Sequence, residues 1–192
     1  MKSWKYILAA LLFSVILTAC GKTNQSEAND ADNSNQSQSE EENKDDSQKI
    51  FGEFSTWNLE GEVVTQEIFE QKSLTMVNIW GTFCGPCISE MPGIGELNRE
   101  YGNRDFQVVG MLCDVYEAGD ETALQIVNET QADYQHLIVS QDLAHGILSQ
   151  VTSVPLTVFL DSEGNMVGEV YMGARDKETW KLIIEQLLVQ VQ

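Results

Sequence analysis

The chain has 192 residues, and its 30 acidic side chains outnumber the 11 basic ones, which gives a formal net charge of −19. A chain with so few cations has little with which to neutralise phosphates, and this argues against a nucleic-acid partner. Hydrophobic residues make up 42% of the sequence, which suffices for one globular core.

The first nineteen residues are predicted to be a signal peptide. Two lysines, Lys2 and Lys5, precede an apolar stretch at 7–17 that is too short to span a membrane comfortably as a mature helix. The stretch runs into Leu17-Thr18-Ala19-Cys20-Gly21, which resembles the lipobox of bacterial lipoproteins. That resemblance implies cleavage before Cys20 and a lipid on this cysteine. The alternatives are an ordinary secretory signal or an uncleaved anchor, with Cys20 incidental.

Residues 20–49 are predicted to form a disordered acidic tether that starts at the lipidated cysteine. Asn, Gln, Ser, Asp and Glu dominate this segment. Such a composition cannot bury enough apolar surface to offset the entropy of ordering. Because charged tethers repel themselves and extend, we expect this one to hold the rest of the chain off the membrane surface.

Residues 50–192 are predicted to form a single domain in which strands and helices alternate. The domain opens with two short strands around the turn at Glu60-Gly61, and the turn at 161–164 joins the last two strands into a hairpin. This order predicts an α/β fold with a mixed central sheet covered by helices on both faces. The later strands are expected at 75–80, 106–113, 137–139, 156–160 and 166–171, and the helices at 87–101, 121–130, 143–148 and 180–191.

A Cys-x-x-Cys motif, Cys84-Gly85-Pro86-Cys87, follows the strand expected at 75–80 and precedes a helical pattern. At a helix N-terminus, unpaired N–H groups and the positive end of the helix dipole favour a thiolate. Cys84 is therefore predicted to be the nucleophile of a redox disulfide, with Cys87 as the resolving thiol. The alternative is half of a zinc site, but the other Cys and His residues of the domain lack the spacing of zinc ligands.

Residues 51–192 resemble members of the thioredoxin superfamily, and more closely those of its TlpA/ResA-like membrane-anchored branch. The resemblance implies a thioredoxin-like fold with an N-terminal β-hairpin, a strand–helix insertion at 106–130 and thiol-disulfide oxidoreductase activity. It implies no metal or organic cofactor, since the redox group is the Cys84–Cys87 pair. The segments that carry it are 78–87, Glu90-Met91-Pro92, Val154-Pro155-Leu156-Thr157 and 161–164.

The resemblance also implies roles for residues around the motif. Pro155 matches the family's cis-proline, which presents the backbone of Val154 to an extended substrate chain. Glu90 matches a glutamate that assists proton transfer at the dithiol, and an exposed surface glutamate is the alternative. Phe83 stands where thioredoxin has tryptophan, and with Gly85 and Pro86 it is expected to contact the substrate.

Some positions are expected to take no part in catalysis. Asn78 occupies the place of thioredoxin's buried aspartate, and because an amide takes no proton at neutral pH, the acid–base role falls to Glu90 or to water. Cys113 ends a strand expected to be buried, which predicts an inert core thiol. His136 and His145 are expected on the surface or in local hydrogen bonds.

The dipeptide between the cysteines matches that of thioredoxin, and this favours reduction of substrate disulfides. The family implies exported protein substrates, of the apocytochrome c or methionine sulfoxide reductase type, and an integral-membrane electron donor of the CcdA type. The expected location is the outer face of the bacterial cell membrane. The alternatives are an oxidase that donates disulfides to exported proteins and, less favoured, a non-catalytic metal-binding lipoprotein.

Overall fold

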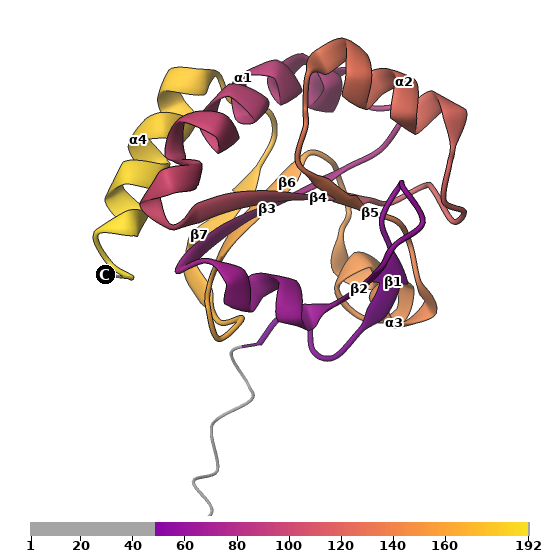
Figure 1. The fold of residues 1–192 in the computed structure, drawn as a ribbon, viewed down its shortest axis with the longest axis horizontal. Helices are drawn as coiled ribbons and strands as arrows, with labels where there is room; N and C mark the ends of the chain where they lie inside the picture. Colours follow the sequence, from indigo (N-terminus) through magenta and orange to yellow (C-terminus); the bar gives the residue numbers. More distant parts are fainter. Residues whose placement is uncertain (1–48, 192) are drawn as a thin grey trace, which may run out of the picture. The chain divides into compact units, whose positions relative to one another are not determined.

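The computed structural model describes residues 49–191, which build a five-stranded mixed sheet with helices on both faces (Figure 1). The strand order is β5-β4-β3-β6-β7, in which β3, β4 and β5 run parallel and β6 and β7 pair antiparallel. This confirms the predicted α/β fold. The strands are β1 (Ser55–Trp57), β2 (Val63–Thr65), β3 (Leu74–Trp80), β4 (Phe106–Leu112), β5 (Gln135–Leu137), β6 (Leu156–Asp161) and β7 (Met166–Met172).

Helices cover each face of the sheet because successive strand residues point to opposite sides. Every residue of β3 is buried, as expected for a central strand covered on both faces. Its Met76 and Trp80 pack toward α1, α2 and α4, whereas Val77 and Ile79 pack toward η2 and α3. The helices are α1 (Gly85–Tyr101), α2 (Glu121–Thr130), α3 (Gln141–His145) and α4 (Lys177–Leu188), with 3₁₀ turns η2 (Gln66–Gln71), η3 (Gly102–Arg104) and η4 (Ile147–Gln150).

The boundaries of β5 differ from the sequence-based expectation. The strand ends at Leu137, although 137–139 was the expected range. The reason lies in the next two N–H groups, which leave the ladder with β4: Ile138 donates to the carbonyl of Trp57 and Val139 to that of Val115. The first bond ties the sheet edge to the β1–β2 hairpin, which itself forms as predicted, and the second ties it to the loop after β4.

Helix ends are set by local caps. Asp120 caps α2 as predicted, by accepting from the N–H of Ala123. Asp176 caps α4 in the same way, so this helix begins three residues before Trp180. The helix expected at 143–148 is divided into α3 and η4, because the backbone of Gly146 is not helical (φ −84°, ψ −121°).

The predicted leader, Cys20 and nearly all of the predicted tether lie outside the described residues and stay predictions. Within residues 49–191, no helix combines the length and the apolar character needed to cross a membrane.

Candidate active site

The Cys-x-x-Cys motif lies where β3 gives way to α1. Cys84 is the N-cap residue of α1, and its Sγ accepts the N–H of Cys87 at 3.2 Å. The two cysteines form a disulfide, in which Cys84 is 5% exposed and Cys87 is fully buried. The helix therefore begins one residue after Cys84. A sulfur in this position faces both an N–H donor and the positive end of the helix dipole, which stabilise a thiolate once the disulfide is reduced.

An open groove of about 550 Å³ borders Cys84. The four residues predicted to contact substrate all line it, although they come from two distant segments of the chain. Phe83 is 72% exposed at its rim. The complete lining is Phe83, Cys84, Gly85, Pro86, Cys113, Leu148, Val151, Thr152, Ser153 and Val154.

Pro155 directly follows the groove residue Val154, and the peptide bond between them is cis, as predicted. The carbonyl of Pro155 accepts from the N–H of Gly173 at 2.9 Å, so the residue that follows β7 holds this carbonyl in place. Pro155 itself is buried. Val154, rather than the proline ring, is therefore the part of this dipeptide that borders the groove.

Glu90 lies outside the groove, buried on α1 one helical turn beyond Cys87. It is 5% exposed, so the alternative of a surface glutamate is wrong. Its Oε1 accepts from Nδ2 of Asn78 at 3.0 Å, and its Oε2 accepts from the backbone N–H of Arg175 at 3.0 Å and from Nε1 of Trp180 at 3.1 Å. Burial raises the pKa of Glu90, and the three donors partly oppose that rise by stabilising the carboxylate.

Asp114 holds the loop before Cys84 and was missed at the sequence level. Its carboxylate accepts from the backbone N–H of Thr82 at 3.0 Å and from the Thr82 hydroxyl at 2.6 Å. A Cβ at position 81 of the same loop would lie 2.7 Å from the Phe83 ring and 3.1 Å from Sγ of Cys113, so a side chain there would displace the exposed Phe83 ring. No local pattern links Asp114 to this loop, since it follows a different strand.

Cys113 is not the core residue that the sequence indicated. The ladder of β4 ends at Leu112, so Cys113 lies just beyond it, half-buried and unpaired, where its side chain lines the groove beside Cys84. Burial raises the pKa of the Cys113 thiol, and the charge of Asp114 adds to this effect. The thiol form is therefore favoured at Cys113.

His136 is buried in a local hydrogen-bond network, one of the two environments expected for it. Its Nδ1 accepts from Nε1 of Trp80 at 3.2 Å, and its Nε2 lies 2.9 Å from the carbonyl of Ala132. Burial lowers the pKa of His136 to about 4. The ring rests on Gly110, where a Cβ would lie 2.2 Å from Nδ1.

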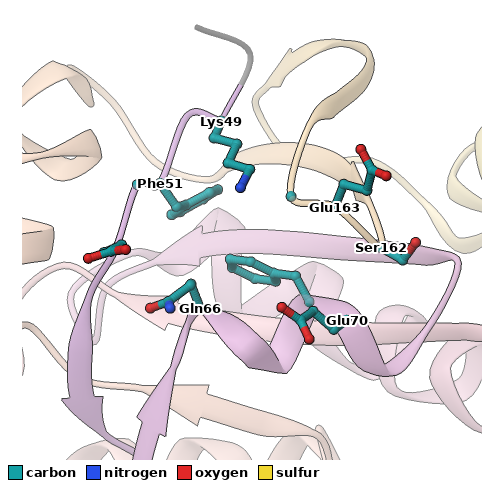
Figure 2. Close-up of a pocket in the computed structure, with 10 residues that line it drawn as sticks. Lys49, Phe51, Gln66, Glu70, Ser162 and Glu163 are labelled. Carbon is teal, nitrogen blue, oxygen red and sulfur yellow. The ribbon is translucent and has the colours of Figure 1, made fainter. Parts of the chain in front are cut away.

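Another cavity, of about 210 Å³, lies between the N-terminal segment, η2 and the β6–β7 turn (Figure 2). This turn follows Asp161, which pairs with Leu74 at the start of β3, so the cavity and the dithiol lie at opposite ends of that strand. No cysteine lines the cavity. Among residues 49–191, no group of three or more His, Cys, Asp or Glu side chains is arranged to hold a metal ion.

Known proteins share both the sequence pattern and the fold. The family model "Redoxin" matches residues 42–174. Thiol-disulfide oxidoreductase ResA of Bacillus thuringiensis subsp. konkukian (strain 97-27) is 29% identical over 127 residues, which cover 65% of this chain and 69% of that protein. The thioredoxin-like protein YneN of Bacillus subtilis (strain 168) is 25% identical over 126 residues, with 66% and 71% covered.

Solved structures agree on the fold. A thiol:disulfide interchange protein of the thioredoxin family from Chlorobium tepidum TLS superposes with a TM-score of 0.59 at 23% identity, over 71% of this chain and 93% of that one. Since the family model spans more than half of the sequence, the chain belongs to the Redoxin family and is a ResA-like oxidoreductase of the thioredoxin superfamily.

Proposed function

We propose that this oxidoreductase works outside the cytoplasm, held at the membrane by a lipid on Cys20, and that it reduces disulfides of exported proteins. The observation that carries the chemistry is the unequal placement of the two cysteines. Cys84 caps α1 and borders the open groove, whereas Cys87 is fully buried behind it. A substrate disulfide can therefore reach Cys84 first, and Cys87 can act only on what Cys84 has bound.

The proposed reaction has two exchange steps. The Cys84 thiolate attacks one sulfur of the substrate disulfide, a mixed disulfide forms, and the other substrate sulfur leaves as a thiolate. The Cys87 thiolate then attacks Sγ of Cys84, and the second substrate sulfur leaves. Two electrons pass to the substrate, and the protein ends with the Cys84–Cys87 disulfide.

We assign proton transfer at the buried thiol to Glu90. Cys87 must lose its proton before it attacks, and it lies away from solvent. Glu90 is buried one turn along the same helix, and its raised pKa brings it closer to neutrality, where a carboxylate is an effective base. No carboxylate at position 78 competes for this role, since that residue is an asparagine.

Substrate recognition is assigned to the groove. The Val154 backbone next to the cis-Pro155 bond offers hydrogen-bonding groups to an extended chain, and Phe83, Gly85 and Pro86 supply an exposed rim. An extended segment around a substrate cysteine suits this shape. Substrates of the apocytochrome c or methionine sulfoxide reductase type would present such segments.

The direction of electron flow is proposed from the Gly85-Pro86 dipeptide, which is that of thioredoxin. Thioredoxin has a reduction potential of about −270 mV and DsbA, a strong oxidant, of about −120 mV. A potential near the first value, measured by equilibration of the dithiol with glutathione or dithiothreitol buffers, supports a reductant that a membrane donor of the CcdA type recharges. A potential near the second would overturn this direction in favour of the oxidase.

The exchange mechanism is tested by trapping. Cys87→Ala, in a Cys113→Ser background, should accumulate a mixed disulfide through Cys84 with exported proteins of the host. The matched control is Cys84→Ala in the same background, which should trap nothing, and removal of Cys113 ensures that no third thiol of the domain contributes. Equal yields of adduct from both variants would contradict the assignment of Cys84 as nucleophile.

A further inference from the structure

Asn78 lies at the centre of the polar contacts around Glu90. It is fully buried on β3, and its Nδ2 donates to Oε1 of Glu90 and to Oγ1 of Thr157, both at 3.0 Å. Thr157 is the direct cross-strand partner of Asn78 on β6 and is 1% exposed. The other end of the amide is unusual, because the buried Oδ1 of Asn78 has no hydrogen-bond partner among the described residues.

The three donors to Glu90 differ in what they can do for a protonated carboxyl group. The backbone N–H of Arg175 and the indole N–H of Trp180, which face Oε2, can donate but cannot accept. A proton on that oxygen would point at two other protons. The amide at Oε1 is different, because it carries an acceptor as well as a donor, and this acceptor is the atom that has no partner.

We propose that Asn78 is a positioning residue whose side-chain amide turns over when Glu90 takes up a proton, with Thr157 as its second partner in both states. With Glu90 ionised, Nδ2 donates to the carboxylate and to the threonine oxygen, as observed. With Glu90 protonated, Oδ1 faces both groups and accepts from the carboxyl O–H and from the threonine O–H, which has rotated. This inference rests on the proposed role of Glu90 in exchange.

The two orientations leave different groups of the buried amide without a partner. Two hydrogen bonds form in either one, but the observed orientation leaves only the carbonyl oxygen unpaired within residues 49–191, whereas the turned one leaves both N–H groups unpaired. The observed orientation is therefore the resting one, and protonation of Glu90, which removes the acceptor at Oε1 and supplies a donor, drives the turn. Thr157 is two residues beyond Pro155, so the same amide also connects the carboxyl group to the strand that follows the groove.

Other charged and titratable groups face Glu90 and act in both states. The guanidinium of Arg175, in the segment before α4, favours the carboxylate. Tyr134, before β5, is neutral because burial, with a contribution from the charge of Glu90, raises its pKa. The cysteine pair lies at the start of α1, with Cys84 as the N-cap residue and Cys87 inside the helix. Holding that pair as a disulfide during the measurement removes thiol titration from the signal.

The test is a pH titration of the full chain in its disulfide form, without substrate. Carbon-13 NMR of the Glu90 carboxyl group gives its midpoint, and the side-chain NH₂ signals of Asn78 should shift with the same midpoint. Asn78→Leu removes a hydrogen bond from both charge states of Glu90 and should therefore move the midpoint less than Trp180→Phe does. Trp180→Phe removes a donor that cannot accept and should raise the midpoint by about one pH unit, a roughly tenfold gain in proton affinity. The matched control is Asn98→Leu, which removes an amide of α1 that accepts from Val108 and should leave the midpoint in place.

A fixed Asn78 that only donates predicts another result. Asn78→Leu would then raise the Glu90 midpoint as much as Trp180→Phe does, and that outcome would overturn the inference. Should either variant fail to fold, the wild-type signals decide, because NH₂ shifts of Asn78 that do not change across the Glu90 titration would also overturn it. Failure of the trapping experiment with an intact coupled titration would refute the proposed exchange role and leave the amide coupling standing.

Discussion

Glu90 and His136 are both buried titratable side chains on the same face of the sheet, yet their surroundings favour different charge states. Asn78, which bonds Glu90, lies in one row of the sheet with Gly110 and His136. Burial favours the neutral form of both groups. At His136 the bond from Trp80 agrees with burial, because its N–H occupies the lone pair that a second proton would need, and the opposing contribution of the Ala132 carbonyl is smaller than that of burial. At Glu90 the bonds oppose burial, because all three come from donors.

This difference separates a structural group from a chemical one. When hydrogen bonds and burial agree, the proton is held in one state across the physiological range. When the hydrogen bonds oppose burial, the protonated and ionised forms of the group are closer in free energy, and a proton can move during a reaction. Of the two, Glu90 is therefore the one whose surroundings fit the proton transfer proposed above.

The largest expected effect comes from crowding the His136 site. Gly110→Ala places a Cβ against the imidazole, so the ring must move and give up its bond with Trp80. We expect a loss of about 3 kcal/mol or more in the free energy of unfolding. Urea unfolding of the oxidised protein measures it. Gly102→Ala is the control, because no atom lies within 4 Å of a Cβ there and the backbone is helical; equal stabilities of the two variants would contradict the packing around His136.

Lowering the pH should destabilise the same His136 site, by as much as or less than Gly110→Ala does. The folded pKa of His136 is lowered to about 4, so its contribution to stability is present above the unfolded value of 6.5 and is lost as the pH falls toward 4. The full loss is about 3 kcal/mol. Urea midpoints at pH 7.5, 6.5 and 5.5 measure the upper part of this window, preferably in Glu90→Gln, which removes the opposing carboxyl. If the NMR signal of His136 in the folded protein titrates near pH 6.5, its pKa is not lowered, and the contrast between His136 and Glu90 is wrong.

Replacement of Glu90 should affect both disulfide exchange and stability. Glu90→Gln should slow reduction of a small disulfide about 100-fold, since a positioned acid–base group contributes about that much. It should also change the pH dependence of stability in the opposite sense to His136. The folded pKa of Glu90 is raised, so its contribution is full below the unfolded value and is lost as the pH rises through the folded one. Single-turnover exchange and urea unfolding from pH 5 to 8 test both parts; an unchanged rate would remove Glu90 from the mechanism.

The sequence predicted the central strands and the dithiol well, because each has a local signal. The apolar run of β3, the spacing of the cysteines and the proline before β6 can all be recognised within a few residues. The edge strand β5 was misplaced, since its register depends on bonds from Ile138 and Val139 to segments far away in the chain.

The surroundings of the site were harder to predict for a related reason. Glu90 could be named, but two of its donors come from the segment around α4, and one of these is a backbone N–H that no residue type reveals. Cys113 was placed in the core because its strand was expected to end one residue later than it does. Such contacts depend on where chain segments meet, and this information is not local.

The bond between Thr82 and Asp114 has a consequence for protein engineering. The segment that presents Cys84 is held in place from the end of the neighbouring strand, outside the motif that defines it. Grafting the stretch from Trp80 to Cys87 onto another scaffold would transfer both sulfurs, but it would leave behind Asp114, which holds their loop through Thr82. A chimaera designed to keep the reactivity of this loop must also import an acidic side chain at the tip of the adjacent strand.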